Sequence, residues 1–288
     1  MGKLSKMLEK SGYSTDLDAF VEPDDVKFDA VEDSIALAKK DTVHYARADS
    51  LHGYPLPRVP GEGQNNHPEV FCSAQKLSES FRLLCSKIFE PANNKNIPRS
   101  IMITSVAPGE GRSYVAANIG MSLAQHIDQE LLFIDCDLRR SSLANVIGVT
   151  AEAGVSDYLL YKGELSALIQ QTPVEKVGIL PAGTPPDNAS ELLGSVRIHD
   201  LVEELAASYP DRCFIFDTPP MEVVPESYVL SQAVDGVVLV VCPERSDEVR
   251  LQQVISDIGA HKILGIISRD DGGADCQSQS SFSFQELP

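Results

Sequence analysis

Six continuous apolar runs constrain the fold of this 288-residue sequence more than any other feature. None alternates polar with apolar residues, as a strand with one face in water would. Helix-length segments separate the runs, which is typical of parallel strands with helices on both faces of the sheet. The runs are SIMITSV (100–106), LLFIDCDL (131–138), VGILPAG (177–183), CFIFDTPP (213–220), GVVLVVCP (236–243) and KILGIIS (262–268). We therefore predict a doubly wound, mostly parallel α/β fold.

Composition divides the chain into three parts. Residues 1–70 start with a short helical pattern and continue as acidic and then Pro-, Gly- and Asn-rich sequence, so we predict a helical and disordered extension with a linker. Residues 71–270 carry the apolar runs and form the predicted domain, which begins with an amphipathic helix that starts at about residue 74 and ends before Pro91. Residues 271–288 are low in complexity, and we predict a disordered tail.

The net charge of −18 works against binding to nucleic acid. No run approaches the length of about 18 apolar residues that a membrane span needs. The N-terminus lacks the apolar stretch of a secretory signal, and the six cysteines form no CxxC pair. We expect a cytoplasmic protein with reduced, mostly buried thiols.

The stretch SVAPGEGRSY has the glycines and the hydroxyl of a phosphate-binding loop. Gly109 and Gly111 allow backbone N–H groups to approach an anion, and the N-terminus of the helix that follows adds a positive dipole end. Ser113 is placed to offer its hydroxyl to Mg²⁺. The pattern GxxxxGK[ST] is broken twice, by Val106 and by Arg112. The predicted nucleotide-binding residues are Gly109, Glu110, Gly111, Arg112, Ser113 and Tyr114.

Three aspartates end two of the predicted strands. Asp135 and Asp137 are two residues apart, so their side chains share one face of an extended segment, and Asp217 ends the strand of CFIFDTPP. In parallel sheets, ligands bind at the carboxyl ends of the strands. A hard divalent cation prefers oxygen ligands, so we predict that Ser113, Asp135 and Asp217 hold Mg²⁺. The alternative is that these aspartates only cap turns.

The three motifs SVAPGEGRS, LLFIDCDLRR and CFIFDTPP, in this order, resemble those of the bacterial tyrosine kinases (BY-kinases) of capsule and exopolysaccharide synthesis. That family belongs to the P-loop ATPases of the Min/Par/Mrp type. The resemblance covers roughly residues 72–270 and is close over 183–220, including the Pro-Pro after Asp217. It implies a sheet of the P-loop NTPase type.

The resemblance also implies a function. Such a domain binds ATP and Mg²⁺ at the inner face of the cell membrane and works with a membrane-embedded polysaccharide chain-length regulator. It transfers γ-phosphoryl groups to tyrosines at the C-terminus of a neighbouring subunit, which implies a homo-oligomer. Carried over here, Asp137 is the candidate base, Arg112 stands at the place of the catalytic lysine, and Asp135 and Asp217 hold the metal.

The sequence departs from the family near the nucleotide and at the tail. Arg112 keeps the positive charge of lysine, but its planar guanidinium is wider and forked, which disfavours fast phosphoryl transfer. Tyr114 is bulkier than the small residue usual there. All eight tyrosines lie at or before Tyr228, and the tail has Phe282 and Phe284 in place of a tyrosine cluster.

Three further positions also differ from the family pattern. Cys85 replaces the second arginine of the Glu-Arg-Arg motif used in ring assembly, of which Glu79 and Arg82 remain. Ser141 replaces a usual proline, and Arg269 stands where the last strand commonly ends in asparagine.

Three hypotheses follow. The first is an ATP-binding kinase-like protein that regulates capsule or exopolysaccharide synthesis and chain length, with weak or altered phosphoryl transfer. The second is a non-enzymatic scaffold for the chain-length regulator, and the third is a Min/Par-type positioning ATPase. The third is disfavoured by the net charge and by the absence of a basic amphipathic helix in the tail. The retained Asp135, Asp137 and Asp217 favour the first.

Overall fold

The computed structural model describes most of the predicted domain and one short segment of the tail. The predictions for residues 1–70, and those for Glu79 and Arg82, lie outside the described residues. The described residues are 81, 85–86, 88–89, 97–126, 130–150, 152–172, 174–270 and, for the backbone, 281–285.

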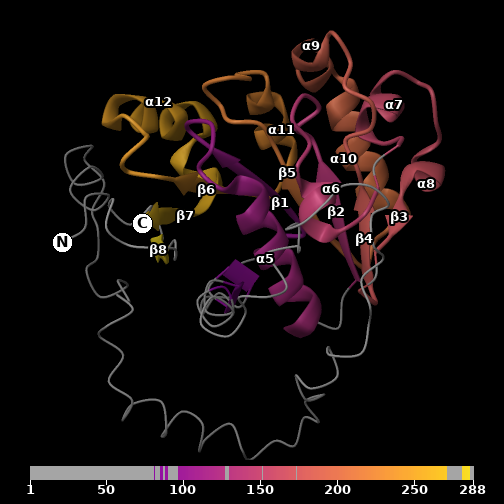
Figure 1. The fold of residues 1–288 in the computed structure, drawn as a ribbon, viewed down its shortest axis with the longest axis horizontal. Coiled ribbons are helices and arrows are strands. Elements are labelled where there is room, and N and C mark those ends of the chain that lie inside the picture. Colours follow the sequence, from indigo (N-terminus) through magenta and orange to yellow (C-terminus); the bar gives the residue numbers. More distant parts are fainter. Residues whose placement is uncertain are drawn as a thin grey trace, which may run out of the picture.

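The sheet has eight strands in the order β3-β4-β2-β5-β1-β6-β7-β8 (Figure 1). The six inner strands are parallel to one another, and the edge strands β3 and β8 are antiparallel to their neighbours. The strands are β1 (Ser100–Ser105), β2 (Glu130–Asp135), β3 (Gln170–Gln171), β4 (Val177–Leu180), β5 (Arg212–Asp217), β6 (Gly236–Val241), β7 (Ile263–Asp270) and β8 (Ser281–Gln285). Each of the six predicted apolar runs overlaps one of the parallel strands, so the prediction of a doubly wound, mostly parallel sheet is confirmed.

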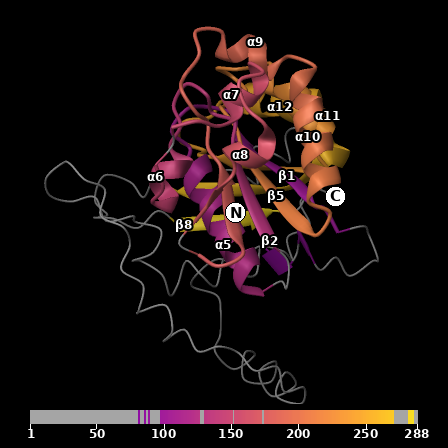
Figure 2. The ribbon, with the colours of Figure 1, turned by 90° about the vertical axis from the view of Figure 1, so that its right-hand side faces the viewer.

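Helices cover both faces of the sheet, as Figure 2 shows. One face carries α5 (Arg112–His126) and α6 (Leu143–Ile147), together with the helical residues Phe81, Cys85, Ile88 and Phe89. The opposite face is covered by α7 (Val155–Leu159), α8 (Leu165–Leu168), α9 (Ala189–Leu193), α10 (Arg197–Ser208), α11 (Ser227–Ala233) and α12 (Glu248–Ile258), which the short η3 (Ala260–Lys262) follows. No helix in these described parts is long and apolar enough to cross a bilayer.

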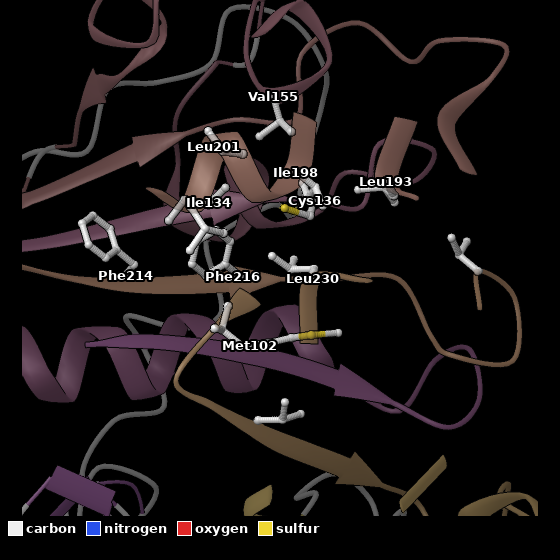
Figure 3. Close-up of a cluster of buried hydrophobic side chains, with 14 of the residues drawn as sticks. Met102, Ile134, Cys136, Val155, Leu193, Ile198, Leu201, Phe214, Phe216 and Leu230 are labelled. Carbon is white, nitrogen blue, oxygen red and sulfur yellow. The ribbon is translucent and has the colours of Figure 1, made fainter. Parts of the chain in front are cut away.

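The core consists of two apolar clusters, one on each face of the sheet. Figure 3 shows the cluster in which Met102 and Phe216 from the strands meet Ile198 and Leu201 of α10. Successive side chains of a strand point to opposite faces, so Ile103, next to Met102, belongs to the other cluster. Both faces of the sheet are therefore buried, and for this reason the sequences of the strands are continuous apolar runs.

The predicted disorder of the tail is wrong for residues 281–285, which form β8 against β7. The sequence SFSFQ alternates polar and apolar residues with the period of a strand. Without it, the β7 edge would present a row of unpaired backbone N–H and C=O groups, and β8 satisfies them.

Candidate functional site

The loop between β1 and α5 lies at the carboxyl end of the parallel strands. Gly109 has φ +80° and Gly111 has φ +91°, a left-handed conformation that glycine adopts without strain. A Cβ atom at Gly109 would also lie 2.7 Å from Nη1 of Arg245. Both glycines are therefore required for the shape of the loop, as the sequence predicted for a phosphate-binding loop.

Glu110 fixes the loop from inside. Its side chain is buried, and its Oε2 accepts a hydrogen bond from the backbone N–H of Ala107 at 2.8 Å. Its Oε1 accepts hydrogen bonds from the N–H of Cys242 at 2.7 Å and from the Ser246 hydroxyl at 2.5 Å. The carboxylate of this predicted nucleotide-binding residue thus joins the loop to the segment after β6, and only its backbone could face a phosphate.

We expect Glu110→Gln to destabilise the protein by about 2 kcal/mol, because the new amide group would meet backbone N–H donors that need an acceptor. The free energy of unfolding in urea measures the effect. Glu191→Gln, at an exposed position of α9, is the matched control and should change stability by less than about 0.5 kcal/mol. Equal stability of the two variants would contradict a structural role of Glu110.

Arg112 and Asp137, predicted to act in phosphoryl transfer, form an ion pair. Nη2 of Arg112 lies 3.4 Å from Oδ2 of Asp137, and the two side chains are 12% and 9% exposed. The other carboxylate oxygen of Asp137 accepts the backbone N–H of Arg140 at 3.1 Å. Nη1 of Arg112 is buried without a hydrogen-bond partner. The guanidinium is therefore directed to the candidate base and retains one unused donor.

The predicted metal ligands also come together. Asp135 and Asp217 are paired in the register of β2 and β5. Asp135 accepts hydrogen bonds from the Ser141 hydroxyl at 2.7 Å and from the backbone N–H of Asp137 at 3.1 Å. Both carboxylate oxygens of Asp217 are buried without a hydrogen-bond partner. The hydroxyl of Ser113 accepts a hydrogen bond from that of Ser142 at 2.6 Å.

Burial and mutual repulsion disfavour the charged forms of these two aspartates. Burial, and then the charge of Asp217, raise the pKa of Asp135 to about 8, although the Ser141 hydroxyl acts against this. Burial likewise raises the pKa of Asp217 to about 7, with Ser113 and Arg112 acting in the opposite direction. A cation between the carboxylates would relieve both the repulsion and the missing contacts of Asp217.

The donors present fit Mg²⁺. This ion usually takes one or two carboxylates and keeps water and substrate phosphates as its other ligands. Two carboxylates and the hydroxyl of Ser113 match that set. Within the described ranges, no three His, Cys, Asp or Glu side chains form a cluster that could hold a metal. Two carboxylates and a hydroxyl leave coordination positions for water and nucleotide phosphates, so the site suits an ion that arrives with a nucleotide.

The stability of the metal-free protein should fall as the pH rises from about 4 to about 8. The folded state keeps protons on Asp135 and Asp217 in this range, whereas the unfolded state has released them, since the ordinary pKa is 3.8. Thermal unfolding in EDTA across this range measures the effect. Asp217→Asn should flatten the profile, and an unchanged slope in that variant would contradict the assignment.

Three side chains near the loop have roles that the sequence did not indicate. The ring of Tyr114, predicted at the nucleotide, packs edge-on against Phe81, with ring centroids 6.4 Å apart. The hydroxyls of Ser141 and Ser142 donate hydrogen bonds to Asp135 and Ser113. The sequence signal for them is their position in RRSSL (139–143), shortly after Asp137.

Comparison with known proteins identifies relatives of this chain. No family model matches the chain. The tyrosine-protein kinase YwqD of Bacillus subtilis is 32% identical over 192 residues, covering 66% of this chain and 79% of YwqD. The tyrosine-protein kinase CpsD of Streptococcus agalactiae is 30% identical over 198 residues, covering 67% of this chain and 83% of CpsD.

The fold of this chain is also similar to that of a solved kinase domain. The kinase domain of the Escherichia coli tyrosine kinase Etk aligns with a TM-score of 0.65 and 26% identity, over 96% of this chain and 98% of that domain. In sequence, Etk is 37% identical over 140 residues, which cover 49% of this chain and 19% of Etk. With relatives at or above 30% identity that are covered over most of their length, and with a sheet of the P-loop NTPase type, the chain belongs to the family of bacterial tyrosine-protein kinases.

Proposed function

We propose that the protein binds Mg–ATP and, as a kinase with slow or altered phosphoryl transfer, regulates the synthesis and chain length of a capsule or exopolysaccharide. The observation that carries the proposal is Asp217. Its buried carboxylate makes no hydrogen bond and lies beside Asp135, an arrangement that costs stability unless a cation is bound. A site with only a structural role has no reason to retain it.

Each residue of the site has a defined task in this proposal. Backbone N–H groups of the loop 109–113 hold the phosphates, and Ser113, Asp135 and Asp217 would hold Mg²⁺, whose charge neutralises the γ-phosphoryl group. Asp137 accepts the proton of the attacking tyrosine hydroxyl. It must first release Arg112, which lies 3.4 Å away. Because the ion pair must break before Asp137 can accept a proton, we propose that phosphoryl transfer is slow.

The proposed partner is a membrane-embedded chain-length regulator, which would hold this protein at the cytoplasmic face of the membrane. The support comes from Etk, where the aligned region makes up 19% of the protein, so the related domain is part of a much longer chain there. Self-association also belongs to the proposal. Cys85, at a position of the family's assembly motif, is buried with its thiol 3.6 Å from the carbonyl of Ile119, so it would not contact a second subunit.

A second candidate function is a scaffold without catalysis, and the ion pair between Arg112 and Asp137 favours it. If this pair persists when nucleotide is bound, the candidate base never becomes available. The scaffold would bind the regulator in a nucleotide-dependent or nucleotide-independent manner, without phosphoryl transfer.

Calorimetric titration of the full chain with a non-hydrolysable ATP analogue, in Mg²⁺ and in EDTA, tests the proposal. We expect binding in Mg²⁺ that weakens strongly in EDTA. Absence of binding in Mg²⁺ would refute the nucleotide site. Binding without turnover, measured as phosphate release with and without a tyrosine-containing acceptor peptide, would support the scaffold.

A further inference from the structure

Two arginines from distant parts of the chain contact the same carbonyl group of the phosphate loop. Nη1 of Arg245 donates to the Gly109 oxygen at 3.3 Å, and Nη1 of Arg269 donates to it at 3.4 Å. Arg245 follows β6, and Arg269 lies near the end of β7. The contact is close, because a Cβ atom on Gly111 would lie 3.2 Å from Nη1 of Arg269.

This carbonyl sets the direction of a donor that the loop needs. In a planar trans peptide, the carbonyl oxygen and the following N–H point to opposite sides. The Gly109 oxygen faces the guanidinium groups, so the N–H of Glu110 points away from them. Glycine at φ +80° imposes little preference of its own on this peptide. The two arginines therefore fix the orientation of the peptide group between Gly109 and Glu110, which the local sequence does not determine.

The backbone of Arg269 depends on the tail strand. The parallel pairing of β6 with β7 extends to Ser268, one residue before Arg269. In the antiparallel pairing with β8, Arg269 lies opposite Phe282, and Asp270 lies opposite Ser281. Among the described residues, the ladder partner of Arg269 is thus in β8. A segment of the C-terminal tail holds the strand end that carries a side chain to the phosphate loop.

We propose that Arg269 is a positioning residue for the phosphate loop and that β8, residues 281–285, keeps it in place. In this proposal, the tail contacts its own domain and stabilises the conformation of the phosphate loop that binds nucleotide. This inference rests on the proposed function in so far as the loop is the site of nucleotide phosphates. The link from β8 through Arg269 to the loop can be tested without nucleotide.

The first test is hydrogen exchange of the loop peptide 107–113 in the nucleotide-free full chain. Arg269→Ala and deletion of residues 281–288 should each speed exchange at this loop about tenfold, since each removes the same brace. Ser283→Ala is the matched control for the deletion, because it leaves the backbone ladder intact, and its loop should exchange as in the native protein. Unchanged exchange in the deletion variant would overturn the inference.

The second test is titration with the non-hydrolysable ATP analogue in Mg²⁺. Arg269→Ala and the deletion should each weaken binding by about fivefold to tenfold, which is the range expected for the loss of one ordinary hydrogen bond. A variant that combines both changes should bind the analogue only slightly more weakly than either single variant. Arg269→Lys should bind it more tightly than Arg269→Ala. Arg250→Ala controls for lost charge, because Arg250 lies on α12 in an ion pair with Glu222.

The two tests separate the possible failures. Additive effects of Arg269→Ala and the deletion, or a loss in Arg250→Ala as large as that in Arg269→Ala, would overturn the inference. Lack of nucleotide binding by the native chain would refute the proposed function, and the exchange experiment would still decide whether β8 braces the loop. Thermal unfolding of every variant is the control that tests whether each change acts on a folded protein.

Discussion

Asp217→Asn should remove Mg²⁺-dependent nucleotide binding, with a loss of affinity of about a hundredfold or more. The substitution keeps the size of the side chain and removes a charged ligand that a hard cation prefers. Asp217 is 1% exposed, so water cannot replace the lost ligand easily. Titration with the ATP analogue in Mg²⁺ and in EDTA measures the change, and the two titration curves should become nearly equal in the variant.

The same substitution should make the metal-free protein more stable above pH 7. A neutral amide in this position costs less than a buried carboxylate whose two oxygens lack partners. Greater stability together with lost metal dependence is the signature of a functional carboxylate, because a structural one would lose stability. Asp211→Asn is the matched control, since this exposed residue directly precedes β5 whereas Asp217 ends it. Metal-dependent binding that survives in Asp217→Asn would contradict the assigned ligand set.

Arg112→Lys should raise the rate of phosphoryl transfer by about tenfold or more. The compact ammonium of lysine can approach the β- and γ-phosphate oxygens, whereas the planar guanidinium is wider and here lies against Asp137. Loss of this ion pair would also leave Asp137 available for the proton of an acceptor hydroxyl. Single-turnover transfer from ATP to a tyrosine-containing peptide measures the rate separately from binding.

Two observations decide how Arg112 acts. Arg139→Lys is the matched control, because Arg139 is exposed and donates to Ser190 at 2.9 Å, so its replacement should leave the rate unchanged. A slower reaction in Arg112→Lys than in the native protein would show that the guanidinium itself is the catalytic cation. In that case the unused Nη1 donor of Arg112 would be its contact to the phosphates.

The sequence by itself determined the strands and their chemistry. Runs such as CFIFD must be buried on both faces, because no polar residue interrupts them, and a parallel sheet is the structure that buries them. Since parallel strands end at one edge, Asp135 and Asp217 were expected to meet, and the register of β2 and β5 pairs them directly. Gly109 and Gly111 could be predicted too, because their role depends on local backbone conformation.

Tertiary structure alone decided the contacts that shape the loop. The inward direction of Glu110 depends on Cys242 and Ser246, which are more than 130 positions away. Arg269 reaches Gly109 across 160 positions. Sequence patterns report local period and burial, whereas strand order decides which distant segments become neighbours. For that reason the tail appeared disordered in the sequence, and only the free edge of β7 gave residues 281–285 a partner.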